Sequence, residues 1–426
     1  MALTKSGYKK RLLDDKISKY LSLFGAISIE GPKWCGKTWT ALNHSESVTY
    51  VTKSEIRDLA LNNPKYIFEN KRPQLIDEWQ KVPSIWDAVR HECDEDSNKG
   101  KFILTGSTTL EKDEADEIYH SGTGRIATMK METMSLYESG DSSGDISIMD
   151  MLNGNVKDGF IKEIDLEYIA DLIIRGGWPD NINTNKEDIG ILPREYINSL
   201  ITKDMHERKD KRRNKNIMTV ILKSLARNES TTVSRQKIVS DIANYEGDEK
   251  LIKDRETVKD YLSVLDDLYI TENQEAYGIN YRSSSRVGKS VKRHFIDPSL
   301  ACASLRLTSK KLMYDFNTFG LMFESLVIRD LRIYMNYLDG YLFHFRDNTS
   351  GDEVDAILEF DDETYAAVEI KLSYRSIDEA KESLINFYKN VSKKPKFMCI
   401  IVGNLSAVMV DEETGIYIIP ITSLKP

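Results

Sequence analysis

The sequence is poor in cysteine and has no long apolar run. Its four cysteines are far apart and form no Cys-x-x-Cys pair, which excludes both a disulfide framework and a thiolate zinc site. Nowhere do about 18 apolar residues follow one another, as a membrane helix would need, and the N-terminal segment lacks the apolar core of a secretory signal. We therefore expect a soluble, cytoplasmic protein with no membrane segment.

The sequence also lacks an excess of basic charge. It has 59 Lys and Arg residues against 68 Asp and Glu residues, a net charge of -9, which excludes a protein that coats nucleic acid by bulk charge. Hydrophobic residues make up 40% of the chain and charged residues 30%, so there is enough apolar material for a packed core. At roughly 100 to 200 residues per domain, the length predicts two to four domains.

The first third of the chain predicts a parallel α/β sheet. Short apolar runs alternate there with helix-sized intervals, and this alternation is typical of parallel strands joined by helices. An acidic, Ser- and Gly-rich stretch after residue 139 predicts a surface loop. The expected strands are residues 26–30, 47–51, 74–78, 101–106 and 125–131.

A phosphate-binding motif follows the first of these strands. Gly31-Pro-Lys-Trp-Cys-Gly36-Lys37-Thr38 fits G-x-x-x-x-G-K-[ST], and a helix-forming segment comes next. Glycines let successive backbone N–H groups point at a phosphate, Lys37 would neutralise the β and γ phosphates, and Thr38 would offer its hydroxyl to Mg²⁺. The alternative, a glycine-rich turn that meets the pattern by chance, is disfavoured by this context.

Further residues of the expected ATP site come from later strands. Asp77 would hold the Mg²⁺ shell, and Glu78 would orient or deprotonate the attacking water. Ser107 follows the next strand, where a hydroxyl would sense the γ-phosphate, although a structural turn is an alternative. Arg125 begins the last strand and would act as a finger on the nucleotide of a neighbouring subunit in a homo-oligomer. Its alternative is an ordinary surface arginine.

The order of these parts resembles the AAA-like ATPase family whose C-terminal half is the DUF4143 domain. The segments that carry the resemblance are GPKWCGKTWT, QLIDEWQKVPSIWDAVR, KFILTGST, GRIATMKMETMSLYESG, RGGWPD and REYINSLITKDM. It implies an AAA-type P-loop fold with ATP as ligand. The bulky Trp34 and the thiol of Cys35 depart from the family's loop, and Cys35 predicts an ATPase that is sensitive to thiol reagents. The residues implied to carry the ATP site are Gly31, Gly36, Lys37, Thr38, Asp77 and Glu78.

The middle of the chain predicts a nucleic-acid contact. Residues 217–296 have the outline of a winged helix-turn-helix, with three short helices followed by two strands. Seven bases and three acids lie at 203–215, and five bases and no acid lie at 278–293; such local positive charge suits phosphate contact, with DNA the expected ligand. A lid or protein-docking module with merely solvated charges is the alternative. The expected contact residues are Arg282, Arg286, Lys289, Lys292 and Arg293.

The C-terminal part predicts a helix, three strands, a helix and a strand. This is the core order of the restriction-endonuclease-like PD-(D/E)XK fold, which the DUF4143 resemblance also implies. Its chemistry needs an acid on the second strand and Glu-x-Lys on the third, and Asp355, Glu369 and Lys371 fill these positions. The carboxylates of Asp355, Glu369 and Glu324 would bind Mg²⁺, and Glu353 is an additional candidate ligand. The alternative is a binding domain in which these charges form a salt-bridged cluster.

We therefore expect a multidomain α/β protein in four parts. These are an AAA-like P-loop NTPase domain at 1–155, a helical lid at 156–215, a winged-helix domain at 216–305 and the DUF4143 nuclease-like domain at 306–426. The expected function is ATP binding and Mg²⁺-dependent hydrolysis coupled to action on nucleic acid, with a phosphodiesterase centre in the last domain. The alternatives are an ATP-driven regulatory switch that binds DNA without cutting it, and an ATPase that acts on protein partners.

Overall fold

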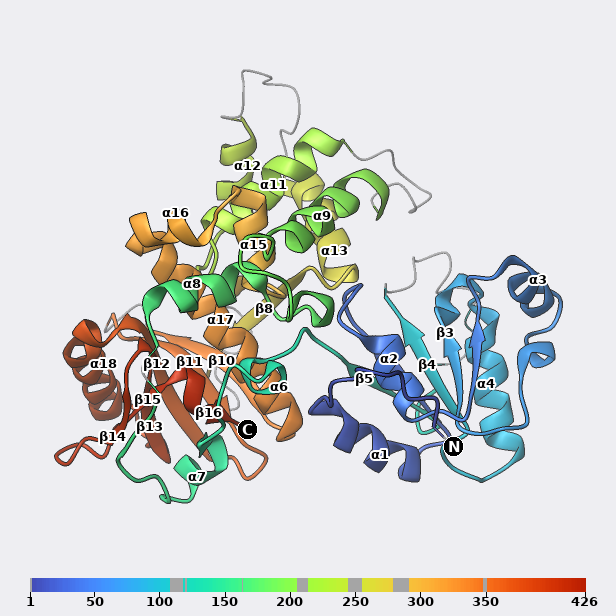
Figure 1. Ribbon diagram of the computed structural model, residues 1–426, viewed down its shortest axis with the longest axis horizontal. Coiled ribbons are helices and arrows are strands. Elements are labelled where there is room, and N and C mark those ends of the chain that lie inside the picture. Colours follow the sequence, from blue (N-terminus) through green and yellow to red (C-terminus); the bar gives the residue numbers. More distant parts are fainter. Residues whose placement is uncertain are drawn as a thin grey trace. The chain divides into compact units, whose positions relative to one another are not determined.

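The computed structural model describes residues 2–107, 118, 121–162, 164–204, 214–243, 255–278, 291–347 and 351–426. The chain forms two compact units (Figure 1). The first consists of Met1–Met134 and Leu265–Tyr269, and the second of Ser135–Val264 and Ile270–Pro426. The four domain boundaries predicted from the sequence divide these units more finely and stay predictions.

A five-stranded sheet forms the centre of the first unit. The strand order is β2-β3-β4-β1-β5, and every pairing is parallel, so the predicted parallel α/β sheet is confirmed. The carboxyl ends of β1, β3 and β4 lie at one edge, because Asp77 pairs with Thr105 and Glu30 with Gly106. The strands are β1 (Ala26–Glu30), β2 (Ser47–Tyr50), β3 (Gln74–Asp77), β4 (Phe102–Gly106) and β5 (Ile126–Lys130).

Both faces of this sheet are buried by helices. Successive side chains of a strand point to opposite faces, and here Ile27 and Ile29 pack with α1 (Leu13–Leu23) and α2 (Lys37–Asn43). Ala26 and Phe102 pack on the other face with α4 (Ser84–Glu95). A sheet covered on both faces explains why its strands are nearly continuous apolar runs. Helix α3 (Ser54–Asn62) completes the helices of at least seven residues in the described part of this unit.

The second unit contains a nine-stranded mixed sheet with the order β7-β14-β15-β13-β12-β11-β10-β8-β9. The predicted series of helix, three strands, helix and strand is present as α17 (Phe316–Tyr337), β10 (Tyr341–Arg346), β11 (Glu353–Glu359), β12 (Tyr365–Ser373), α18 (Ile377–Asn390) and β13 (Phe397–Asn404). The remaining strands are β6 (Ile146–Ser147), β7 (Gly159–Phe160), β8 (Thr271–Ala276), β9 (Lys292–Phe295), β14 (Ala407–Val410), β15 (Tyr417–Pro420) and β16 (Leu424–Lys425).

The predicted winged-helix region contains three helices and two antiparallel strands. The helices are α11 (Lys215–Arg227), α12 (Arg235–Ala243) and α13 (Arg255–Asp267), and the strands are β8 and β9. These strands also extend the nine-stranded sheet, because β8 pairs in parallel with β10. The other α-helices of the described second unit are α6 (Leu136–Ser139), α7 (Ile148–Leu152), α8 (Leu166–Arg175), α9 (Ile191–Ser199), α15 (Pro298–Leu305) and α16 (Ser309–Tyr314).

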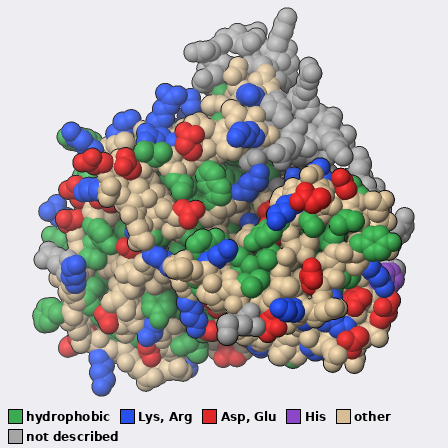
Figure 2. All heavy atoms as spheres, turned by 45° about the vertical axis from the view of Figure 1, so that its right-hand side comes forward, with side chains coloured by type: hydrophobic (Ala, Val, Ile, Leu, Met, Phe, Trp, Pro, Cys, Tyr) green, Lys and Arg blue, Asp and Glu red, His purple; other side chains and the backbone are tan. Residues whose placement is uncertain are grey.

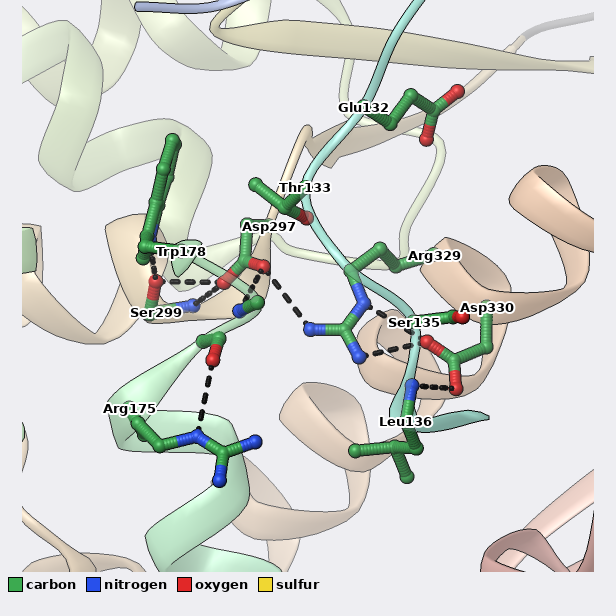
Figure 3. A network of polar contacts seen from close by, with 12 residues as sticks. Glu132, Thr133, Ser135, Leu136, Arg175, Trp178, Asp297, Ser299, Arg329 and Asp330 are labelled. Carbon is green, nitrogen blue, oxygen red and sulfur yellow. Dashed lines mark hydrogen bonds and ion pairs between the residues drawn. The ribbon is translucent and has the colours of Figure 1, made fainter. Parts of the chain in front are cut away.

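A buried ionic network ties four segments of the second unit together (Figure 3). Arg329 of α17 reaches Asp297 at 3.1 Å and Asp330 at 2.7 Å. Asp330 accepts a hydrogen bond from the backbone N–H of Leu136 at 3.0 Å, and Asp297 accepts one from Gly177 at 2.9 Å. Since breaking a buried pair costs about 3–5 kcal/mol, this network fixes α17 against the start of α6 and the end of α8.

Charges on the surface are mixed. Lys and Arg side chains are interspersed with Asp and Glu side chains over the described part of the face shown in Figure 2. Among the described residues, no helix combines the length and the apolar character that crossing a bilayer requires.

Candidate nucleotide site and carboxylate cluster

The loop between β1 and α2 requires glycine at two positions. Gly31 has a φ of 149°, and a Cβ there would lie 2.0 Å from the carbonyl oxygen of Met131. Gly36 has a φ of 104° and caps the N-terminus of α2. Only glycine adopts such conformations without strain. The loop can therefore curl tightly into the first turn of a helix, whose free N–H groups favour anions.

The two residues that end the motif face different partners. The Lys37 side chain is buried, and its Nζ donates to the carbonyl oxygens of Gly31 at 2.9 Å and Pro32 at 2.7 Å. The ammonium group thus lies along the inside of the loop. The Thr38 hydroxyl instead donates to Asp77 Oδ1 at 2.7 Å. The structure therefore brings together Thr38 and Asp77, which the sequence predicted to share a metal ion.

Asp77 lies at the carboxyl end of β3, between its two neighbouring strands. Its Oδ1 also accepts a hydrogen bond from Thr105 of β4 at 2.8 Å. A carboxylate held beside a hydroxyl offers the hard oxygen donors that Mg²⁺ prefers. Together with the glycine cradle and the buried ammonium of Lys37, this donor set fits Mg²⁺ and the phosphates of a nucleotide.

Glu78 is held in a defined orientation next to Asp77. Its φ of 58° is left-handed, and its Oε2 accepts hydrogen bonds from Ser107 at 3.0 Å and Gln80 at 2.6 Å. Ser107, predicted to sense a phosphate, therefore positions Glu78 in this structure. The Gln80 Oε1 and Trp79 Nε1 atoms are buried without a hydrogen-bond partner in the described chain. A Cβ at Gly106 would lie 3.1 Å and 3.4 Å from them, which places both at the end of β4.

Arg125 lies at the amino ends of the strands, whereas the loop follows the carboxyl end of β1. Its carbonyl oxygen accepts a hydrogen bond from Ala26 at the start of β1, and its guanidinium pairs with Asp94. The five residues of β1 separate it from Gly31, about 16 Å at the usual rise of a strand. Arg125 is thus not part of the site within one chain, and its action on a neighbouring subunit stays a prediction.

Arg11 is a residue of this site that the sequence did not identify. Its buried guanidinium donates to the carbonyl oxygens of Cys35 at 2.8 Å, Glu132 at 3.0 Å and Thr133 at 2.9 Å. Arg11 thereby fixes the loop against the segment that follows β5. Its partners lie 24, 121 and 122 positions away, so no local pattern indicated the role.

Cys35 is fully buried beneath the loop, with Sγ 3.7 Å from the carbonyl oxygen of Met131. A thiol reagent cannot reach a buried sulfur in the folded chain, and only accessible thiolates react readily. The predicted sensitivity of the site to thiol reagents at this residue is therefore wrong for the folded state.

The second unit brings together Asp355, Glu369 and Lys371, as the sequence predicted. Asp355 Oδ2 accepts a hydrogen bond from the backbone N–H of Ile370 at 2.9 Å. Glu369 Oε2 lies 3.2 Å from Lys371 Nζ, and its Oε1 accepts from Ser383 at 3.1 Å. Burial, reinforced by the charge of Asp355, raises the pKa of Glu369 to about 8. Burial lowers the pKa of Lys371, but the carboxylates of Glu369 and Asp355 outweigh it and leave that pKa raised.

Lys292 lies elsewhere than the sequence predicted. It was expected to contact nucleic acid, but it is only 3% exposed. Its Nζ lies 3.1 Å from Glu324, 3.2 Å from Glu353 and 3.7 Å from Asp355. Burial raises the pKa of Glu324 to about 8, although Lys292 opposes this shift. We call Glu324, Glu353 and Asp355 the carboxylate cluster.

The predicted metal ligands of the second unit are not gathered around one point. Glu324 and Asp355 converge on Lys292, whereas Glu369 faces Lys371 and Ser383. Within the described ranges, no group of three or more His, Cys, Asp or Glu residues is arranged to hold a metal ion. The structure thus places a lysine ammonium among acids that were expected to bind Mg²⁺, and the Mg²⁺ site of Glu324, Asp355 and Glu369 stays a prediction.

The remaining predicted nucleic-acid contacts are only partly described. Arg293 follows Lys292 in β9, and its Nη1 donates to Asn273 at 3.0 Å. The predictions for Arg282, Arg286 and Lys289 lie outside the described residues.

Family models match three parts of the chain. Residues 24–139 match an AAA domain, residues 166–311 a domain of unknown function, DUF8612, and residues 319–424 a second one, DUF4143. No curated protein matches the sequence at a significant level.

Several solved structures are distantly similar. A Walker-type ATPase of Pyrococcus abyssi shares 12% identity over 71% of this chain and 98% of its own, with a TM-score of 0.42. The ORC2 protein of Aeropyrum pernix, solved with ADPNP and ADP, shares 12% identity over 75% of this chain and 96% of its own, with a TM-score of 0.33. DnaA of Aquifex aeolicus, solved with AMPPCP, shares 12% identity over 60% and 86%, with a TM-score of 0.28.

Proposed function

We propose that the chain, whose residues 24–139 match an AAA domain and whose residues 319–424 match DUF4143, binds ATP with Mg²⁺ at the loop of the first unit and hydrolyses it. One observation carries the proposal: the Thr38 hydroxyl lies 2.7 Å from Asp77 Oδ1. This pair joins the start of α2 to the end of β3. A nucleotide-dependent Mg²⁺ site needs a hydroxyl and a carboxylate from those two elements.

Each residue of the site has a role in this reaction. The N–H groups of the loop and of the first turn of α2 bind phosphate oxygens, and Lys37 neutralises their charge. Thr38 and Asp77 hold Mg²⁺, which supplies Lewis-acid stabilisation of the phosphate charge when it is bound. Glu78, oriented by Ser107 and Gln80, orients the attacking water and accepts its proton.

The replacement Lys37→Ala tests this function. The variant should lose ATP hydrolysis and bind ATP more weakly, because it removes the ammonium group that lies along the inside of the loop. Lys19→Ala, which removes an exposed lysine of α1, serves as the matched control and should hydrolyse ATP as the parent does. A Lys37→Ala variant as fast as the parent would contradict the proposal.

The ATPase also engages nucleic acid in this proposal, through the middle of the chain. Two features support it, namely the base-rich stretches 203–215 and 278–293 and the three helices followed by an antiparallel strand pair. DNA should stimulate ATP hydrolysis, and rising salt or the double replacement of Arg282 and Arg286 by Ala should weaken the stimulation. Stimulation by protein partners alone would favour the alternative of a protein-directed ATPase.

For the DUF4143 domain, the position of Lys292 favours a binding domain that does not cut. A hydrolytic centre needs metal-coordinating carboxylates, and here an ammonium lies among three of them. The intact protein should therefore not nick plasmid or single-stranded DNA with Mg²⁺ or Mn²⁺. Nicking that disappears in Asp355→Ala and Lys371→Ala would overturn this part and restore the nuclease interpretation.

A further inference from the structure

We infer that Lys292 is a built-in cation of the carboxylate cluster, so that its ammonium group takes the place of a divalent metal ion. The three closest carboxylate oxygens belong to Glu324 at 3.1 Å, Glu353 at 3.2 Å and Asp355 at 3.7 Å. An ammonium group has three N–H donors, and three acids surround this one. The inference deepens the proposal of a non-cleaving DUF4143 domain.

The acids and the lysine come from regular elements that fix their positions. Glu353 and Asp355 are two residues apart in β11 and therefore point to the same face of the sheet. Glu324 comes from the long helix α17. Lys292 begins β9 and pairs with Gln274 of β8. The backbones of β9, β11 and α17 thus fix the positions from which the lysine and the three acids converge.

Gln274 holds the lysine-bearing strand pair against the acid-bearing strand. Its Nε2 donates to the carbonyl oxygen of Phe343 at 2.9 Å and to that of Asp355 at 3.0 Å. Its Oε1 lies 3.1 Å from Nε2 of His294, two residues beyond Lys292. The lysine is therefore delivered to the acids by the tertiary fold and does not depend on a mobile surface side chain.

The charges of the cluster need compensation from inside the protein. The Lys292 side chain is 4% exposed, and those of Glu324 and Asp355 are 14% and 15% exposed. Grouped carboxylates at such depth are costly unless a cation accompanies them. The other nearby lysine is engaged elsewhere, because Lys371 lies 3.2 Å from Glu369. Lys292 is thus the described cation that contacts all three acids of the cluster.

A neutral side chain at position 292 would leave three hard oxygen ligands around the space of the former ammonium. Such ligands suit Mg²⁺ and Mn²⁺. Removing a unit positive charge from this space should tighten binding of a divalent cation by about tenfold or more. The replacement should therefore create a metal site that the parent protein does not have.

Binding of Mn²⁺ to the full-length chain, counted by electron paramagnetic resonance without nucleotide, tests this inference. Every protein carries Asp77→Asn, which weakens any metal site at the first unit's loop equally. The parent should bind no Mn²⁺ at the cluster. Lys292→Gln should bind one additional Mn²⁺ per chain, and Lys292→Gln/Asp355→Asn should lose it. Lys371→Gln, the matched control, should gain none.

If Lys292→Gln binds no more Mn²⁺ than the parent, the inference is overturned. If Lys292→Gln does not fold, Lys292→Gln/Glu324→Gln decides, because it removes one positive and one negative charge together. That variant should bind Mn²⁺ through Glu353 and Asp355, and its unfolding temperature should rise with Mn²⁺ while the parent's does not. An unchanged unfolding temperature would contradict the inference. The measured quantity here is metal binding, so this test can fail independently of the proposed function. The non-cleaving proposal would instead be contradicted by DNA cleavage by the intact protein.

Discussion

Arg11 donates a hydrogen bond to the carbonyl oxygen of Cys35 at 2.8 Å and so holds the phosphate-binding loop from behind. The same guanidinium binds the carbonyl oxygens of Glu132 and Thr133, in the segment that follows β5. A planar guanidinium with five fixed donors can serve three acceptors at once, which an ammonium cannot do with the same geometry.

Arg11→Lys should therefore weaken ATP binding. Losing about one to two buried hydrogen bonds, at about 1–3 kcal/mol each, predicts at least a tenfold rise in the dissociation constant measured with a fluorescent ATP analogue. Arg57→Lys, at an exposed position of α3, is the control and should bind like the parent. Unchanged affinity in Arg11→Lys would show that the loop does not depend on this arginine.

Arg329→Met should destabilise the second unit strongly. The replacement leaves Asp297 and Asp330 buried without their common partner (Figure 3), and breaking a buried ion pair costs about 3–5 kcal/mol. Urea unfolding followed by circular dichroism measures the loss. Lys259→Ala, which removes an exposed pair with Glu256, should change little. Similar losses in both variants would contradict the special role of the buried network.

The buried acid Glu229 should make stability depend on pH. Burial raises its pKa to about 8, although Ser325, the Phe295 amide and the charge of Arg332 oppose the shift. His294 lies 3.3 Å away, and burial holds its pKa well below the ordinary value. Because the folded state binds the proton of Glu229 more tightly than the unfolded chain, with its ordinary pKa of 4.5, the stabilisation is complete below that pH. It is lost as the pH rises through about 8.

The free energy of unfolding in urea should therefore decline between pH 5 and pH 9 in the parent, and Glu229 should contribute about one proton to the slope beside Glu324 and Glu369, whose pKa values are also raised. Glu229→Gln keeps the shape of the side chain and removes the titration, so its decline over this range should be smaller. Parallel pH profiles for the two proteins would refute the raised pKa.

All four cysteines are buried, so the native protein should react slowly with a thiol reagent and keep its ATPase activity. Unfolding in guanidinium should then expose four reactive thiols. Ellman's reagent counts them in both states. Fast modification of Cys35 in the native protein, with loss of ATP hydrolysis, would show that the loop opens to solvent.

The parts predicted well are those whose signals are contiguous in the chain. The loop from Gly31 to Thr38 is one continuous segment, and the strand before it and the helix after it supported its prediction as a phosphate-binding loop. The apolar runs of β1 and β4 indicated a parallel sheet because both faces are buried. The strand order then brings Asp77 to Thr38, since parallel strands end at the same edge.

The parts predicted poorly depend on contacts between distant segments. Lys292 was assigned to a nucleic-acid contact because residues 278–293 hold five bases and no acid, but its ammonium group contacts acids of α17 and β11. The distance of Arg125 from the loop within one chain likewise depends on the register between β1 and β5, which the residues around Arg125 do not indicate. Its action on a neighbouring subunit stays a prediction.

The most direct test of the central claim is ATP hydrolysis by Glu78→Gln, with ATP binding measured on the same preparation. The amide keeps the hydrogen-bonding shape of Glu78 but cannot accept the proton of water. We predict that the rate falls by about 100-fold or more while ATP binds as tightly as in the parent. Hydrolysis at the parental rate would contradict the assignment of this site as the ATPase centre.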